Sequence, residues 1–129
     1  MRLLLDTHVA IWALTSPELL SAEVSVLIAN PDNSVYVSVA SVWEIAIKFS
    51  LAKTGAPPFS GTDAVGYFRD AGYLLLDIKA DHAAAVERLP SLHSDPFDRL
   101  IVAQALSEPL RLVTRDHRVA AYSDTIISW

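Results

Sequence analysis

Cysteine is absent from this chain of 129 residues, which excludes disulfide bonds and metal sites built on thiolates. No apolar run is long enough to cross a bilayer, and Asp6 and His8 interrupt the apolar start too early for a signal peptide. We therefore expect a cytoplasmic protein that does not associate with a membrane.

An excess of basic residues is also missing. The chain has 10 lysines and arginines against 15 aspartates and glutamates, which gives a net charge of −5. Proteins that bind nucleic acid through charge alone are normally basic, so this composition argues against metal-free binding of a polyanion. It leaves metal-dependent binding open, because bound divalent cations would offset most of the negative charge.

The sequence has no internal repeat, no low-complexity tract and no linker long enough to separate domains. With 52% hydrophobic and 19% charged residues, its length favours one domain spanning residues 1–129 with a substantial core. Five short apolar runs predict strands, at residues 2–6, 34–38, 73–77, 111–116 and 125–129. Helical patterns lie between them, at residues 8–15, 17–30, 41–49, 62–69, 80–89 and 96–107. This alternation predicts an α/β fold: a three-layer α/β/α domain with a parallel sheet of four or five strands.

Four acidic residues from distant segments are expected at one edge of that sheet. Asp6 ends the first strand and Asp116 follows the fourth, while Glu44 and Asp98 lie near the starts of two helices. Parallel sheets form ligand sites at the carboxyl ends of their strands. Any one of these acids could simply cap a helix or be solvated, but four together repel one another unless a cation or shared protons compensate.

An all-carboxylate site suits Mg²⁺ or Mn²⁺ better than Zn²⁺. A pair of such cations can activate water and stabilise the leaving oxygen in phosphodiester hydrolysis. The predicted site is therefore compatible with a metal-dependent nuclease.

Four motifs together resemble the PIN domain, and more narrowly the VapC toxins of type II toxin–antitoxin modules. They are LLLDTH (3–8), SVASVWEIAIK (38–48), HSDPFDRLIVAQA (93–105) and LVTRD (112–116). The resemblance implies an endoribonuclease dependent on Mg²⁺ or Mn²⁺, whose metal site is formed by Asp6, Glu44, Asp98 and Asp116. It also implies an RNA substrate, a cognate antitoxin protein as partner, and a homodimer. Under this interpretation Asp98 is a metal ligand, whereas Asp95 is the N-cap of its helix.

Several neighbours of the four acids have two open interpretations. Thr7 either donates its hydroxyl to a carboxylate or a metal-bound water, or caps a helix, and Ser41 has the same alternatives with capping favoured. Arg99 either contacts phosphate or pairs with Asp95, and we favour the ion pair. Arg115 is either a phosphate contact or part of a solvated loop that includes His117 and Arg118.

The remaining candidates are given structural roles. Lys48 is expected to pair with Glu44 one helical turn away. His8 and His93 lie near the predicted edge but lack a spaced histidine partner for metal ligation. His82 is expected on a helix surface, and Trp12 and Trp43 in the core or in a dimer interface, with residues 17–28 in that interface as well.

Other functions remain as alternatives. A haloacid-dehalogenase-type phosphatase would need a second acid at position 8, where this chain has histidine. The main alternative is a catalytically inactive PIN-like domain that only binds a partner protein. Cleavage of RNA by the partner-free protein in the presence of metal would separate this alternative from the enzyme.

Overall fold

The computed structural model describes residues 1–129 and contains one parallel sheet of five strands, as predicted. The strands are β1 (Arg2–Leu5), β2 (Ser34–Ser38), β3 (Leu74–Leu76), β4 (Arg111–Thr114) and β5 (Ile127–Ser128). Their order across the sheet is β3-β2-β1-β4-β5, so β1 is central. In the register, Leu4 of β1 is paired with Tyr36 of β2 on one side and Leu112 of β4 on the other.

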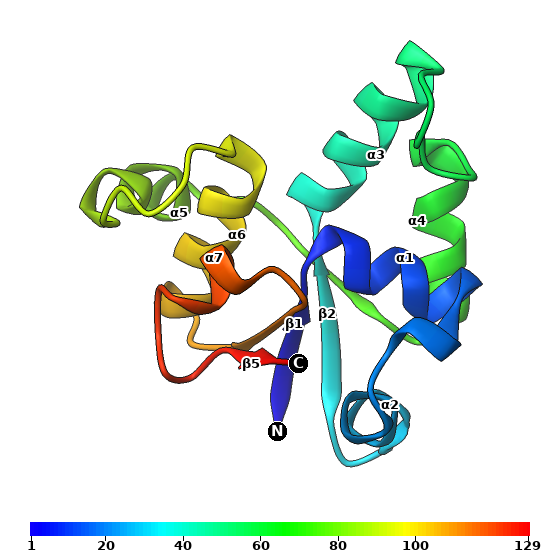
Figure 1. The fold of residues 1–129 in the computed structure, drawn as a ribbon, viewed down its shortest axis with the longest axis horizontal. Helices are drawn as coiled ribbons and strands as arrows, with labels where there is room; N and C mark the ends of the chain where they lie inside the picture. Colours follow the sequence, from blue (N-terminus) through cyan, green and yellow to red (C-terminus); the bar gives the residue numbers. More distant parts are fainter.

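Helices cover both faces of the sheet. They are α1 (Thr7–Thr15), α2 (Ala22–Ala29), α3 (Val39–Leu51), α4 (Gly61–Asp70), α5 (Ala80–Ala85), α6 (Pro96–Ser107) and α7 (His117–Ala120). Figure 1 shows α1 to α4 on one side of the sheet and α5 to α7 on the other, which confirms the predicted three layers. No helix has the length and apolar character needed to cross a membrane.

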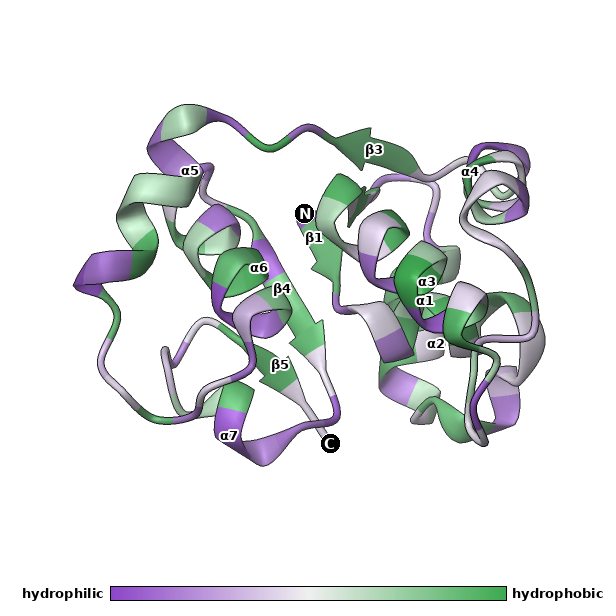
Figure 2. Ribbon diagram, turned by 90° about the horizontal axis from the view of Figure 1, so that it is seen from above, coloured by the Kyte–Doolittle hydropathy of each residue, from purple (hydrophilic) through white to green (hydrophobic).

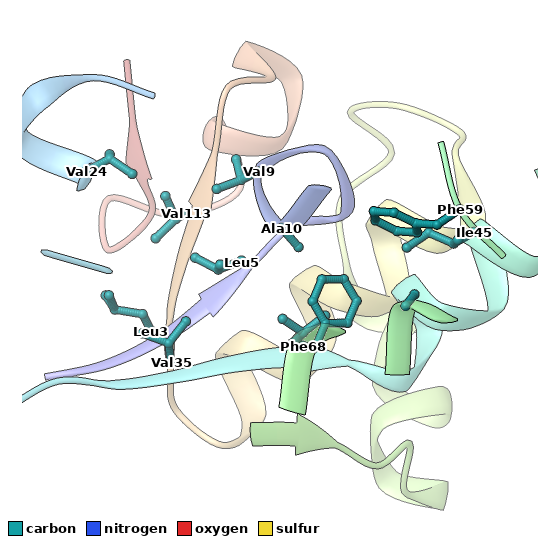
Figure 3. Close-up of a cluster of buried hydrophobic side chains, with 12 residues drawn as sticks. Leu3, Leu5, Val9, Ala10, Val24, Val35, Ile45, Phe59, Phe68 and Val113 are labelled. Carbon is teal, nitrogen blue, oxygen red and sulfur yellow. The ribbon is translucent and has the colours of Figure 1, made fainter. Parts of the chain in front are cut away.

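The alternation of side chains along β1 divides the core between the two faces. Leu3 and Leu5 pack with Phe68 and other residues of α1 to α4, as Figure 3 shows. Leu4 points the other way and belongs to a second cluster formed with α6 and α7. In Figure 2, β1 and β4 are accordingly hydrophobic over most of their length, whereas α7 has a hydrophilic and a hydrophobic part, of which Val119 joins the core. A buried central strand therefore fixes the position of whatever follows Leu5.

The predicted helix over residues 17–30 was wrong in its extent. A 3₁₀ turn spans Pro17–Leu19, the backbone of Leu20 is extended, and a separate helix begins after Ser21. The Ser21 hydroxyl accepts a hydrogen bond from the Val24 amide, so a second N-cap interrupts what the apolar pattern alone joins together.

Other boundaries differ by a few residues. The segment predicted as one helix over 80–89 is α-helical only to Ala85 and continues as a 3₁₀ turn, Val86–Arg88. The helix predicted from Thr62 begins at Gly61, capped by Ser60. The four-residue helix α7 was not predicted, because it is too short to show a periodic pattern.

His82 is buried, contrary to the prediction of a surface position; only 1% of the residue is exposed. Its Nδ1 accepts a hydrogen bond from the Lys79 amide at 3.0 Å, which places the ring proton on Nε2. Nε2 lies 2.6 Å from Glu108 Oε2 and donates to it. Burial is tolerated because both ring nitrogens have partners, and this polar contact joins α5 to the end of α6.

Gly61 allows α3 and α4 to pack closely. A Cβ added at this position would lie 2.7 Å from the Cβ of Ala46, whereas one added at Gly66, in the same helix, would meet nothing within 4 Å. We expect Gly61→Ala to lower the free energy of unfolding by about 1–3 kcal/mol through overpacking. Gly66→Ala should raise it by about 0.5–1 kcal/mol through helix propensity. Urea denaturation of both variants measures this, and equal effects would contradict the proposed close approach.

Candidate metal centre

The four acids predicted from the sequence lie at or near the carboxyl ends of the central strands. From β1 the chain passes to β2 and β3 on one side of the sheet and then returns to β4 on the other side. This reversal makes the edge beyond β1 and β4 a topological switch point, where open parallel sheets bind ligands. Asp6 directly follows β1, and Asp116 lies two residues beyond β4.

Asp6 is almost completely buried, with 5% of the residue exposed, and it is the N-cap of α1. Its Oδ1 accepts the Val9 amide at 2.9 Å, and its Oδ2 accepts the Thr114 hydroxyl. Burial raises the pKa of Asp6, and nearby Glu44 raises it further, although these two hydrogen bonds oppose the shift. Each carboxylate oxygen can accept more than one contact, so Asp6 retains capacity to bind a cation.

Glu44 extends from α3 toward the same edge and is 3% exposed. The Thr7 hydroxyl donates to Glu44 Oε1 at 2.7 Å and also lies 2.9 Å from the hydroxyl of Ser41. Thr7 therefore supports a carboxylate and is not the N-cap, because Asp6 has that role. Ser41 lies inside α3, behind Thr7, and does not cap the helix, which begins after Ser38.

The predicted pairing of Lys48 with Glu44 is confirmed. The Lys48 ammonium donates to Glu44 Oε2 at 2.5 Å, one turn along α3. Partial burial by itself lowers the pKa of Lys48, but Glu44, with Asp95 and Asp98, outweighs it and leaves the pKa raised. Lys48 thus places a positive charge against the buried Glu44 at the acidic edge.

Asp95 and Asp98 have different roles in the first turn of α6. Asp95 is the predicted N-cap, since its Oδ1 accepts the Asp98 amide at 3.0 Å. Burial, together with repulsion from Asp95, Asp6 and Glu44, raises the pKa of Asp98 to about 6, although a hydrogen bond with His93 opposes the shift. Asp98 of α6 is therefore repelled by Asp6, which follows β1, and by Glu44 of α3, as expected if these three segments meet at one edge of the sheet.

Asp116 lies at the rim of the site and is the N-cap of α7. Burial alone would raise its pKa, but hydrogen bonds from Arg118 outweigh this and leave the pKa lowered. The Thr114 hydroxyl accepts the Asp116 amide at 3.0 Å while it donates to Asp6, and so connects the two acids. The neighbouring Arg115 guanidinium lies 5.8 Å from the centre of the Trp129 ring.

The donor set fits a hard divalent cation. Asp6, Glu44 and Asp98 offer only carboxylate oxygens, and no imidazole or thiolate belongs to this set. Glu44 adds to the raised pKa of Asp6, and Asp6 and Glu44 add to that of Asp98, in both cases after burial. In this conformation no group of three or more histidine, aspartate and glutamate side chains is arranged to hold a metal ion. The Lys48 ammonium lies against one oxygen of Glu44, and its positive charge would oppose a cation bound at the same oxygen.

A cavity of about 180 Å³ adjoins Glu44 and Thr7. Its wall includes Trp12 and two prolines of the loop that follows α3, Pro57 and Pro58. Trp12 is half-buried and contacts Trp129, with the ring centres 6.4 Å apart. Trp43, by contrast, is 55% exposed and packs edge-on against Phe97, so it is not a core residue.

The predicted ion pair between Arg99 and Asp95 was wrong. Arg99 turns away from the carboxylates and donates to the carbonyls of Val86, Pro90 and His93 and to the Tyr122 hydroxyl. The sequence pattern also missed Thr114, and it considered His93 only as a metal ligand. Thr114 is the second residue before Asp116, and its polar side chain at the buried end of an apolar strand was the available signal.

A family model described as PIN domain matches residues 3–124. The chain belongs to the PIN domain family. Ribonuclease VapC22 of Mycobacterium tuberculosis (strain ATCC 25618 / H37Rv) is 33% identical to this PIN domain over 123 residues, covering 92% of this chain and 90% of the relative. The resemblance to VapC proteins found in the four sequence motifs is therefore confirmed.

Solved structures show the same fold over the whole PIN domain. VapBC2 from Rickettsia felis, bound to a DNA fragment from its promoter, matches with a TM-score of 0.71 and 18% identity, covering 100% of this chain and 98% of that chain. DNA-bound VapBC from Salmonella typhimurium matches with a TM-score of 0.69 and 18% identity, covering 100% and 97%.

Proposed function

We propose that this PIN domain is a metal-dependent endoribonuclease and the toxin of a type II toxin–antitoxin pair. The observation that carries the proposal is the convergence of Asp6, Glu44 and Asp98 at the switch point of the sheet. Burial is the main cause of the raised pKa of Asp98, and Asp6 and Glu44 are among the acids that add to it. A structural role does not require acids from three distant segments to lie at one edge of the sheet. The named activity of Ribonuclease VapC22 supports the same reaction class.

In this proposal the cation is Mg²⁺ or Mn²⁺, and Asp6, Glu44, Asp98 and Asp116 hold it. Bound there, such ions supply an activated water and stabilise the leaving oxygen of an RNA phosphodiester. Lys48 would compete with a cation for Glu44 Oε2, because the ammonium and a divalent cation at the same oxygen would repel each other.

The chain's own hydroxyl groups orient the carboxylates. Thr7 fixes Glu44 Oε1, and Thr114 fixes Asp6 Oδ2. Hydrogen bonds of this kind restrict the rotamers of the acids before any ion binds. We expect Arg115, an exposed residue beside Asp116, to contact the RNA backbone.

The partners follow the same reasoning. We expect a cognate antitoxin, as in the VapBC complexes that share the fold, to inhibit the protein by placing a basic side chain among the carboxylates. The Lys48–Glu44 contact shows that an ammonium fits there. We also expect a homodimer, for which exposed apolar residues such as Val26 of α2 and Trp43 of α3 offer surface.

The test is RNA cleavage by the purified, partner-free protein with Mg²⁺, with Mn²⁺ and with EDTA, beside the Asp6→Asn variant. We expect cleavage with either cation and none with EDTA, and a variant that remains folded but inactive. Cleavage that persists in EDTA, or in Asp6→Asn, would contradict the proposal. An inactive but folded wild-type protein would favour the partner-binding alternative.

A further inference from the structure

A buried histidine lies directly behind the carboxylate of Asp98. His93 comes from the loop before α6, and only 2% of its side chain is exposed. Its Nε2 lies 3.3 Å from Asp98 Oδ2, and its Nδ1 lies 2.8 Å from the hydroxyl of Tyr122. Both ring nitrogens are therefore used within the protein, which leaves none for a metal ion.

The directions of these hydrogen bonds can be deduced from Arg99. The Arg99 guanidinium lies 3.0 Å from the Tyr122 oxygen, and because a guanidinium can only donate, this oxygen accepts. The Tyr122 hydroxyl proton is then available for its other partner, His93 Nδ1. With Nδ1 accepting, the proton of the neutral ring is on Nε2, which donates to Asp98.

The opposite tautomer fails at both ends of this chain of contacts. A proton on Nδ1 would leave the Tyr122 hydroxyl proton without an acceptor. It would also place the bare Nε2 lone pair against an ionised carboxylate oxygen. Buried polar groups without partners are costly, so the geometry favours a single tautomer.

The backbone around His93 is fixed by the same arginine. Arg99 donates to the carbonyl oxygen of Pro90 at 3.0 Å and to that of His93 itself at 3.4 Å. The backbone of His93 is thus held in place, as well as both nitrogens of its ring. Arg99, one turn into α6, thus holds the loop before the helix, and this loop places the His93 ring against Asp98.

We propose that His93 is a positioning residue, whose Nε2–H group, set by Arg99 and Tyr122, orients Asp98 so that its Oδ1 is free to bind the cation. This inference rests on the proposed function, since it assigns the cation to Asp98. His93 would then support Asp98 as Thr7 supports Glu44 and Thr114 supports Asp6, each through one hydrogen bond to the carboxylate. Groups that support metal ligands in this way typically contribute 10–100-fold to metal affinity or activity.

The tautomer can be measured without metal or RNA. Nitrogen-15 NMR of the histidine rings at about pH 8.5, well above the ordinary histidine pKa of about 6.5, distinguishes Nε2–H from Nδ1–H. We expect the Nε2–H form for His93 in the wild-type protein and a mixture of both forms in Tyr122→Phe. Tyr67→Phe, which changes an exposed tyrosine of α4, is the matched control and should leave His93 unchanged. A predominant Nδ1–H form in the wild type would overturn the proposal.

Metal affinity tests the consequence for Asp98. A glutamine side chain can place an N–H near the position of Nε2, whereas an asparagine reaches only as far as Nδ1. We therefore expect His93→Asn to weaken Mn²⁺ binding about tenfold or more, measured by electron paramagnetic resonance of the free ion, and His93→Gln to recover most of the affinity. Equal Mn²⁺ affinity in the wild type and in His93→Asn would overturn the positioning role, and so would an equal loss in both variants.

The two proposals can fail separately. If the wild-type protein binds no Mn²⁺ and cuts no RNA, the proposed function fails, and the positioning of a metal ligand fails with it. If Mn²⁺ binds and RNA is cut but His93→Asn behaves as the wild type does, only the inference about His93 fails. Circular dichroism of each variant identifies any loss that comes from unfolding, and His93→Gln then provides the folded comparison.

Discussion

Asp98→Asn is expected to abolish most RNA cleavage while Asp95→Asn, three residues earlier in the same turn, remains active. Asparagine is nearly isosteric with aspartate and caps a helix about as well, so Asp95→Asn keeps the hydrogen bond from the Asp98 amide. Asp98→Asn removes the charge that holds the cation. We expect its cleavage rate to fall more than about 100-fold, beyond the loss typical of a group that only supports a ligand.

The same substitution should stabilise the protein in EDTA. The pKa of Asp98 is raised from its ordinary value of 3.8 to about 6 by folding, so the native state favours the protonated form. The contribution of Asp98 to the unfolding free energy is therefore highest at low pH and decreases as the pH rises from about 4 through 6, where the native state must ionise this carboxyl. Asparagine cannot ionise and avoids this loss. We expect Asp98→Asn to gain about 1 kcal/mol at pH 7, a value reduced for partial exposure, and little or nothing at pH 4.

Cleavage rate and melting temperature, measured for both variants with and without Mn²⁺, test this prediction. Mn²⁺ should raise the melting temperature of the wild type and of Asp95→Asn, but not that of Asp98→Asn. Equal activity in the two variants would end the assignment of Asp98 as a metal ligand. A melting temperature of Asp98→Asn in EDTA below that of the wild type at pH 7 would show that the carboxylate is stabilising and not repelled.

The difference between Asp95 and Asp98 could be predicted from sequence because it depends on local geometry. The proline at position 96 fixes the start of α6, and the residue before it is then the N-cap. The strands were predicted for a similar reason: a strand buried on both faces is a short, continuous apolar run, as in residues 3–5. The order of strand and helix then determined which acids share an edge.

Contacts between distant segments could not be predicted in this way. His93 contacts Tyr122 across 29 positions, and Thr114 contacts Asp6 across 108. Arg99 has an acid four positions before it, yet it binds three backbone carbonyls and a hydroxyl. The local pattern favoured an ion pair, but the tertiary structure brings four acceptors, most of them partly buried, to the planar guanidinium. The residues that hydrogen-bond to the acids are thus the part of the site that could be identified only from the structure.

Lys48→Met is the second variant with a large expected effect, and its sign depends on whether a cation is present. Glu44 is buried, and Lys48, about half exposed, donates to it at 2.5 Å. Removing one partner of a buried pair leaves an uncompensated charge, which costs 3–5 kcal/mol when both groups are buried. Because Lys48 reaches solvent, we expect a loss of about 1–3 kcal/mol in EDTA. Lys53→Met, at an exposed lysine of the loop after α3, should have little effect.

With Mn²⁺ present, Lys48→Met should no longer be at a disadvantage to the wild type. If a cation must displace the ammonium from Glu44 Oε2, removing the ammonium removes a competitor, and Lys48→Met should bind Mn²⁺ more tightly than the wild type, by about tenfold. Saturating Mn²⁺ would then recover the stability lost in EDTA. Glu44→Gln provides the complementary case, because it removes the negative charge for which Lys48 and the cation compete, and it should bind Mn²⁺ weakly whether or not Lys48 is present. Weaker Mn²⁺ binding by Lys48→Met than by the wild type would contradict the predicted competition between ammonium and cation. It would mean instead that Lys48 supports the conformation of Glu44 that binds metal.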